Sequence, residues 1–328
     1  MGMTFLRRRH LLLAAPAVLA RPSLAAAWRP QQPVRVVIGA APGGTLDIHA
    51  RAAQPILAAV MGQPVVVENQ GGGAGLVGAQ AVARAPADGH TMLVISGDGL
   101  VLQDILVGAR RGRVRPALRP VTMTITAAQL LVTHPRSGIR NVGEYFDALR
   151  RRGDRVTLAV PGIGGIAHVV SEMVTRQLGL QVTHVPYRGG GPATLDLLAG
   201  QVDAMIITLP AVTTHVREGR LVPLAVSTGE RDPAMPQVPT FAESGVTGFD
   251  VPSTQGVLMP AATPEDAVEA WYGAWRSALA DPGVRARLQE LGFVIRSTAP
   301  ADFARDLEDA DRRFAQVIAA AGIRGEDG

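Results

Sequence analysis

The sequence predicts an α/β protein of two lobes with a ligand cleft between them, and three observations predict it. Short β-rich runs alternate with helical patterns through most of the chain, which favours parallel strands flanked by helices. The stretches VVIGAAPGGTLDIHA and LAVPGIGGIAHVVSE share one plan of strand, glycine-rich turn and helix. The chain has 328 residues, 47% hydrophobic and 18% charged, which is long enough for two domains that each bury a core.

Residues 1–27 have the pattern of a secretory signal peptide. Arginines 7–9 precede the apolar run 11–20, and an Ala-Ala-Ala site ends at residue 27. The paired arginines fit a twin-arginine signal as well as an ordinary Sec signal, and both alternatives stay open. No later run of about 18 apolar residues follows. The sequence therefore predicts an exported, soluble periplasmic protein that begins near Trp28.

The first part of the mature chain carries most of the expected strands. We expect strands at residues 34–38, 65–67, 91–95, 156–160, 182–185, 204–207 and 221–226. Apolar residues spaced by three and four predict a helix over 46–60, which Pro55 should kink. A second helix is predicted over 166–178, with Gly179 as its C-cap.

The last part of the chain is predicted to be mostly helical. Thr263 has the place of an N-cap, followed by Pro264 at the first helical position and two acids. Trp271 and Trp275 lie on one face of this helix, where core packing is favoured over a ligand-binding role. Residues 281–283 should break the helix, and a final helix should cover the sheet of the first lobe.

The two repeated turns suggest sites for an anion. The first N–H groups of a helix lack partners within the helix, and the helix dipole places partial positive charge there. Gly43 and Gly44 would expose these groups in the first turn, with Thr45 as the expected N-cap. Glycines 162, 164 and 165 would do so in the second turn. A purely structural turn is the alternative at both places, and capping, packing and ligand contact all remain open for His168.

Other functional classes are less well supported. Residues 73–78 match G-x-G-x-x-G, but five residues separate them from the preceding strand, and an exported protein has no dependable nucleotide supply. We expect no cofactor. The chain has no G-x-S-x-G elbow, no histidines at metal-binding spacing and no cysteine, so neither catalysis nor a metal is expected. Scattered arginines and 4% aromatic residues argue against nucleic acid.

Several long motifs carry a family resemblance. They are APGGTLD, GQPVVVENQGGGAGLVGAQAVARAPADGHTML, GIGGIAH, VPYRGGGPATLDLLAGQVDAM and VPTFAESGVTGFD. With them the chain resembles the periplasmic substrate-binding receptors of tripartite tricarboxylate transporters, the Bug-type proteins. The resemblance implies a type II periplasmic-binding-protein fold that closes like a Venus flytrap over a small carboxylate and delivers it to a membrane permease. A sensor without a permease and an exported enzyme are the alternatives.

The resemblance also implies lobe boundaries and a binding site. One lobe would comprise residues 28–126 and 253–328, the other residues 127–252, with a hinge near Thr126 and Ser253. The implied ligand-binding residues are Ala41, Pro42, Gly43, Gly44, Asp47, Ser96, Gly97, Asp98, Gly162, Ile163, Gly164, Gly165, Ile166, Ala167, His168 and Thr208.

The chain departs from the family pattern in the expected binding site. Residues 163–167 lack the serine and asparagine common there, an acid is replaced at Ile207 or Thr208, and a tryptophan is replaced by Thr254. Loss of these polar groups makes the expected pocket more apolar. We therefore expect an apolar or aromatic monocarboxylate rather than an amino acid or citrate, because an ammonium group would need the missing carboxylate.

Overall fold

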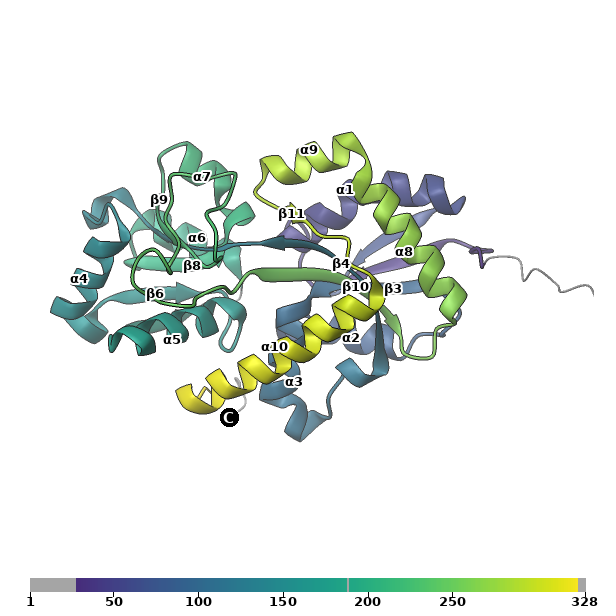
Figure 1. Ribbon diagram of the computed structural model, residues 1–328, viewed down its shortest axis with the longest axis horizontal. Coiled ribbons are helices and arrows are strands. Elements are labelled where there is room, and N and C mark those ends of the chain that lie inside the picture. The colour runs from purple at the N-terminus through teal and green to yellow at the C-terminus, as the bar shows by residue number, and fades with distance from the viewer. Residues whose placement is uncertain (1–27, 188, 324–328) are drawn as a thin grey trace, which may run out of the picture.

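The described part of the chain forms two α/β halves joined by long strands (Figure 1). A computed structural model describes residues 28–187 and 189–323 of the 328. The expected signal peptide, residues 1–27, lies outside the described residues. We call the six-stranded sheet with its helices the first lobe, and the five-stranded sheet with its helices the second lobe.

The sheet of the first lobe combines parallel and antiparallel strands. In order across the sheet, its strands are β11 (Val294–Ile295), β4 (Leu118–Ala127), β10 (Ser253–Pro260), β3 (Thr91–Ser96), β1 (Val34–Ile38) and β2 (Val65–Asn69). Strands β1, β2 and β3 are parallel, whereas β10 pairs antiparallel with both β3 and β4. The carboxyl ends of the three parallel strands therefore share one edge of the sheet.

The sheet of the second lobe has the same mixed character. Its strands in order are β7 (Thr183–Pro186), β6 (Thr157–Val160), β8 (Ala204–Thr208), β5 (Gln129–Thr133) and β9 (Val222–Val226). Strand β6 is parallel to β7 and β8, and β5 is antiparallel to β8 and β9. The chain passes between the two sheets where β4 ends and β5 begins, and again just before β10.

Helices cover both sheets. Those of the first lobe are α1 (Thr45–Met61), α2 (Leu76–Ala83), α3 (Gly97–Arg111), α8 (Glu265–Ala280), α9 (Pro282–Glu290) and α10 (Pro300–Ala321). Those of the second lobe are α4 (Val142–Arg152), α5 (Ile166–Leu178), α6 (Gly190–Ala199) and α7 (Thr213–Arg217). No described helix is long and apolar enough to span a bilayer.

The strand and helix predictions are confirmed where the chain alternates locally. All seven predicted strands are present with ends shifted by two residues or fewer, and α5 ends at Gly179, whose φ is 64°. The sequence patterns missed β4, β5, β10 and the two-residue β11, and the predicted parallel sheets are mixed, because these four strands pair antiparallel with their neighbours. Strand β4 contains Pro120 and alternating threonines instead of a plain apolar run.

Three local details of the helices differ from expectation. Helix α1 runs unbroken through Pro55, and its N-cap is Gly44, one residue before the predicted Thr45. The N-cap of α8 is Pro264, and the hydroxyl of Thr263 is buried without a partner among the described residues. The predicted break after α8 is confirmed, because the Asp281 carboxylate accepts the N–H groups of Gly283 and Val284 and so starts α9.

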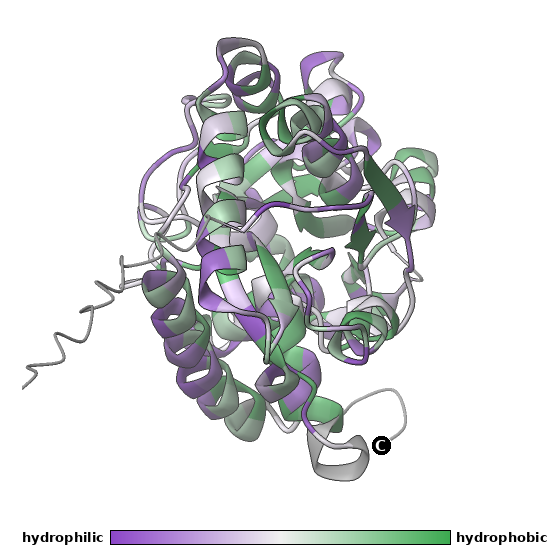
Figure 2. Cartoon of the chain, turned by 90° about the vertical axis from the view of Figure 1, so that its right-hand side faces the viewer, coloured by the Kyte–Doolittle hydropathy of each residue, from purple (hydrophilic) through white to green (hydrophobic). Residues whose placement is uncertain are grey.

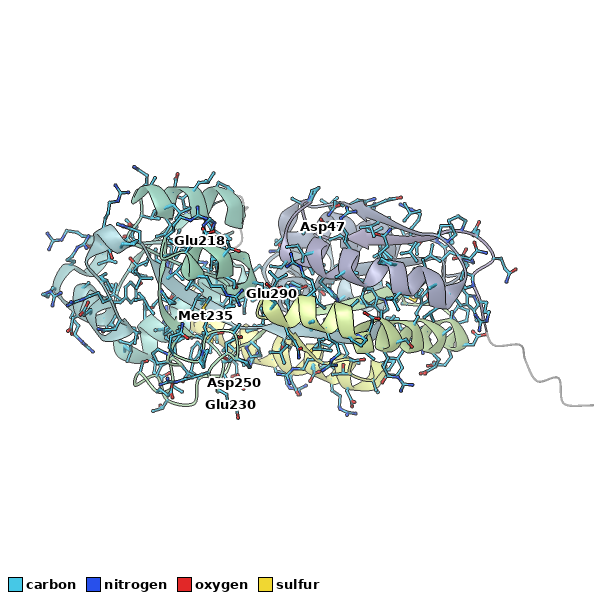
Figure 3. All side chains as sticks on the ribbon, turned by 90° about the horizontal axis from the view of Figure 1, so that it is seen from above. Asp47, Glu218, Glu230, Met235, Asp250 and Glu290 are labelled. Atoms are coloured by element: carbon cyan, nitrogen blue, oxygen red, sulfur yellow. The ribbon has the colours of Figure 1, made fainter. Side chains whose placement is uncertain are left out.

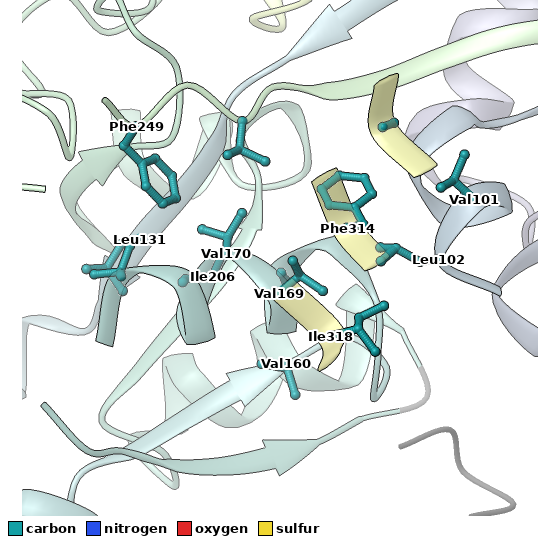
Figure 4. Close-up of a cluster of buried hydrophobic side chains, with 14 of the residues drawn as sticks. Val101, Leu102, Leu131, Val160, Val169, Val170, Ile206, Phe249, Phe314 and Ile318 are labelled. Carbon is teal, nitrogen blue, oxygen red and sulfur yellow. The ribbon is translucent and has the colours of Figure 1, made fainter. Parts of the chain in front are cut away.

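Each lobe buries an apolar cluster of its own, as the sequence predicted, but a third cluster joins the two lobes. One cluster contains Val101 of α3 and Phe314 of α10 together with Val170 of α5, so it crosses from the first lobe to the second. Figure 4 shows Phe314 and Ile318 beside Val169 and Val170. The cause is α10, which covers β4 of the first-lobe sheet as predicted but also packs against α3 and α5 (Figure 1).

The distribution of apolar residues on α10 explains how one helix packs against both lobes. Phe303, Leu307 and Phe314 are buried, whereas the charged residues between them are exposed except for Asp311, which is partly buried. Figure 2 shows the same division of polar and apolar residues around the helices and strands. The tryptophans of α8 also pack as predicted, since Trp271 and Trp275 have no exposed surface.

Candidate functional site

A cleft of about 870 Å³ lies between the two lobes. Its walls come from both lobes and from the segments that join them. The lining residues are Ala40, Ala41, Pro42, Gly43, Gly44, Thr45, Leu46, Ile48, Ser96, Ser253 and Gln255 of the first lobe, and Gln129, Pro161, Ile166, Ala167, Gly189, Gly190, Gly191, Pro192, Thr194, Leu195, Ile207, Thr208, Pro210, Ala211 and His215 of the second. Figure 3 shows the two halves from above, with Asp47 in one and Glu218 in the other.

Helix N-termini from both lobes meet at this cleft. The first turns of α1, α5 and α6 contribute lining residues, and Ser96 immediately precedes α3. These helices follow the carboxyl ends of their strands, where open α/β sheets bind ligands. Each N-terminus carries N–H groups without helical partners and the positive end of the helix dipole. The cleft therefore gathers partial positive charge from backbone groups.

The first glycine-rich turn holds the N-terminus of α1 open. Gly43 has a φ of 78°, a conformation that L side chains rarely adopt, and its N–H donates to the Asp47 carboxylate at 2.9 Å. Gly44 is the N-cap and no side chain caps the helix. The first N–H groups of α1 thus have no side-chain acceptor among the described residues.

The second turn repeats this geometry in the other lobe. Gly164 has a φ of 69°, and its N–H donates to Nδ1 of His168 at 3.0 Å. The N-caps Gly165 and Gly44 have φ and ψ of −76° and 169°, and −75° and 171°. The repeated sequence plan is therefore a repeated structure, in which a side chain four residues on accepts the N–H of the left-handed glycine.

The two turns differ in charge. Burial alone would raise the pKa of Asp47, but hydrogen bonds from Arg51, Gly43 and Asn69 outweigh burial and lower this pKa. Burial lowers the pKa of His168, so the corresponding residue of the second turn is neutral near pH 7. The acceptor of the left-handed glycine N–H is thus a carboxylate in the first turn and a neutral imidazole in the second.

His168 also lies beside Glu172 and His184, and their ligating atoms fall within 4.8 Å of one another. Because Nδ1 of His168 accepts the Gly164 N–H, the proton of the neutral ring is on Nε2, 3.9 Å from Glu172 Oε1. A metal at that nitrogen would have to displace this proton while Nδ1 remains an acceptor. The geometry therefore favours His168 as a residue that positions the turn rather than as a metal ligand.

The structure brings about half of the sequence-predicted site residues to the cleft. Those that line it are Ala41, Pro42, Gly43, Gly44, Ser96, Ile166, Ala167 and Thr208. The others stand behind the lining or beside it: Asp47, Gly97, Asp98, Gly162, Ile163, Gly164, Gly165 and His168.

Asp98 is an example of a residue behind the lining. Its side chain is 1% exposed, and its carboxylate accepts the N–H of Thr254 at 2.6 Å. Burial raises the pKa of Asp98 to about 6. Asp98 thus joins the start of α3 to the start of β10, next to the passage between the lobes.

Sequence reasoning missed several lining residues. Gly189 is the N-cap of α6, and Gly190 and Gly191 are its first residues, so a third glycine-rich helix start follows β7, and this repetition was a usable signal. Gln129 and Gln255 reach the cleft from β5 and β10. Nothing in the sequence pointed to these two residues, because neither β5 nor β10 has a local pattern strong enough to predict a strand.

A family profile described as the tripartite tricarboxylate transporter family receptor, TctC, matches residues 49–323. The chain belongs to this receptor family. BugT of Bordetella pertussis is 30% identical to the receptor over 325 residues, 99% of each chain.

Two solved structures are also similar to the receptor. One is Rpa4515 of R. palustris with adipate, at 30% identity and a TM-score of 0.84, covering 90% of this chain and 99% of that one. The other is MatC of Rhodopseudomonas palustris with bound malate, at 30% identity and a TM-score of 0.81, covering 88% and 99%. These likenesses span both lobes, so the receptor has the two-lobed periplasmic-binding-protein fold that the sequence predicted.

The glycines of the G-x-G-x-x-G stretch have a structural explanation in the receptor. A Cβ at Gly75 would lie 3.1 Å from the carbonyl oxygen of Gly39, and one at Gly78 would lie 3.2 Å from the Gly39 Cα. Glycines are therefore needed where α2 and its preceding turn pack against the end of β1. This packing supports the first glycine-rich turn, residues 41–44.

Proposed function

We propose that the receptor captures a small carboxylate with a largely apolar body in the cleft between its lobes. The observation that carries the proposal is the composition of the cleft. Helix N-termini converge on it, and His215 is the one ionisable side chain among the described lining residues. Backbone N–H groups can hold a carboxylate. Proline, isoleucine, leucine and alanine side chains can cover its carbon skeleton.

The receptor acts in the periplasm and passes its cargo to the permease subunits of a tripartite transporter, without converting it chemically. Membership of the receptor family, the adipate and malate bound to similar proteins, and the amino-terminal signal pattern support this assignment. Among the described lining residues, no serine or threonine hydroxyl is hydrogen-bonded to His215, the pairing that would activate a nucleophile for hydrolysis.

Closure occurs by rotation of residues 28–126 and 253–328 against residues 127–252. The membership of β4 and β10 in one sheet and of β5 in the other supports these boundaries. Contacts across the cleft support a closed arrangement. The Thr213 hydroxyl donates to the Leu291 carbonyl at 3.0 Å, and Arg217 donates to the carbonyl of Glu290, which Figure 3 places where the lobes meet.

Calorimetry of the mature protein with a panel of acids tests the proposal. We expect phenylacetate or benzoate to bind, and citrate and aspartate to bind at least tenfold more weakly. Small-angle scattering should show compaction on binding, and mass spectrometry should recover the acid unchanged. Absence of binding by every carboxylate would overturn the proposed function. Tight citrate or aspartate binding without any heat from the aromatic acids would overturn the apolar specificity.

A further inference from the structure

Two glutamines line the cleft from equivalent places beside the two passages between the lobes. Gln129 is the first residue of β5, and Gln255 is the third residue of β10. Their exposed fractions are 1% and 3%. An uncharged amide at such a buried place carries both a donor and an acceptor, so it can distinguish ligands by their neutral polar groups.

Both amides are held in the same way. Nε2 of Gln129 donates to the Thr208 hydroxyl at 3.0 Å, and Nε2 of Gln255 donates to the Thr45 hydroxyl, also at 3.0 Å. Each threonine oxygen is thereby used as an acceptor, which leaves its own O–H proton available. All four residues line the cleft. Each lobe therefore presents a threonine hydroxyl donor next to a glutamine amide oxygen.

The oxygens of the two amides have no hydrogen-bond partners among the described residues. Oε1 of Gln255 is buried and has no hydrogen-bond partner among the described residues. No bond to Oε1 of Gln129 is present in that part of the chain either. A buried acceptor without a donor is unfavourable, and a ligand O–H or N–H would relieve it.

We propose that Gln255 and Gln129 determine specificity by selecting carboxylates that also carry a hydroxyl group. This inference rests on the proposed function, because the carboxylate itself is held at the helix N-termini. The glutamine oxygen accepts the hydroxyl proton, and the neighbouring threonine O–H donates to the hydroxyl oxygen. Thr45 is the first residue of α1, so the Gln255 pair places this hydroxyl close to a carboxylate bound at that helix.

Matched pairs of acids test the proposal. Mandelate and phenylacetate differ by one hydroxyl group beside the carboxylate, as do malate and succinate. We expect calorimetry of the wild-type receptor to show at least tenfold tighter binding of the hydroxy acid in the pair that the cleft accommodates. A site built around a hydroxyl group discriminates strongly against analogues that lack it, because its own polar groups are then left unpaired.

Gln255→Met and Gln129→Met preserve side-chain length and remove the amide. We expect each to weaken hydroxy-acid binding about tenfold and to change binding of the deoxy acid by less than threefold. Gln54→Met is the matched control, because the Gln54 amide donates to the Val65 carbonyl and does not line the cleft. It should alter neither affinity.

Thr45→Val and Thr208→Val provide a second test if a methionine variant does not fold, since they remove only the hydroxyl partners. They should reduce the same preference. Equal binding of hydroxy and deoxy acids by the wild type would overturn this inference alone. Equal losses for both acids in the methionine variants would also overturn it, because the amides would then serve the carboxylate. Failure of these four acids and of every carboxylate in the first panel to bind would overturn the proposed function and this inference with it.

Discussion

Gly44→Val tests whether the N-terminus of α1 is a binding surface. Gly44 lines the cleft and has φ −75° and ψ 171°, extended backbone that any residue can adopt. A Cβ there would lie 3.4 Å from the Ala41 carbonyl oxygen, an ordinary contact. The substitution therefore fits the fold, while its methyl groups stand beside the N–H groups of Thr45 and Leu46.

The structure sets the size of the expected effect. A hydrogen bond to a charged group contributes about 1.5–3 kcal/mol, so the loss of two such bonds from a carboxylate costs roughly 3–6 kcal/mol. Because about 1.4 kcal/mol corresponds to a factor of ten, affinity should fall roughly 10²- to 10⁴-fold. Valine is a poorer N-cap than glycine by up to about 1 kcal/mol. A less flexible unfolded chain offsets about 0.4–1 kcal/mol of this cost.

Calorimetry with the best-binding acid and thermal unfolding of the same samples measure both quantities. We expect affinity to collapse and the melting temperature to change by only a few degrees. Gly143→Val is the matched control, because Gly143 lies in the exposed first turn of α4, away from the cleft. Wild-type affinity in Gly44→Val would refute the reasoning, since the N-terminus of α1 would then not contact the ligand.

Three further predictions concern buried polar groups. Burial raises the folded-state pKa of Asp98 to about 6, above its unfolded value, so ionisation should lower the free energy of unfolding by at most about 3 kcal/mol as the pH rises from 4 to 6. Asp98→Asn keeps an acceptor for the Thr254 N–H and should remove this dependence in urea titrations; parallel profiles would contradict it. Burial lowers the pKa of His49 to about 3, so the free energy of unfolding should fall as the pH drops from about 6.5 toward 3. In acid unfolding, His49→Phe should show a smaller loss of this free energy. An unchanged acid transition would show that another group controls it. His168→Leu leaves the Gly164 N–H without its acceptor and should weaken ligand binding about tenfold in calorimetry. His168→Asn retains an acceptor and should recover part of the lost affinity. Equal affinities in the two variants would exclude the positioning role.

The sequence by itself determined the local units of this protein. Alternation of apolar residues predicted the strands that precede each turn, and glycine spacing predicted the turns, because both depend on the backbone preferences of neighbouring residues. Gly43 and Gly164 adopt the positive φ that such turns require. The excess of helix in the last part of the chain followed from the same short-range periodicity.

Short-range patterns could not predict partners that are distant in the sequence. Strand β4 pairs with β10 about 130 residues away, as the contact of Thr124 with Gln255 shows, and neither strand has a strong local pattern. The places of Gln129 and Gln255 depend on this pairing. The N-cap of α1 was misplaced by one residue, since the Thr45 hydroxyl accepts a hydrogen bond from Gln255, 210 residues away, and does not cap its own helix.

The tertiary structure also decided which residues of the glycine turns face the cleft. Asp47 and His168 occupy the same position in their repeats, yet each turns its side chain back to a glycine N–H and away from the lining. Only the packing of one lobe against the other, through α10 and α5, places the two turns on opposite walls of one cleft. The local sequence thus specified the parts that can bind an anion, whereas contacts between distant segments set their relative positions.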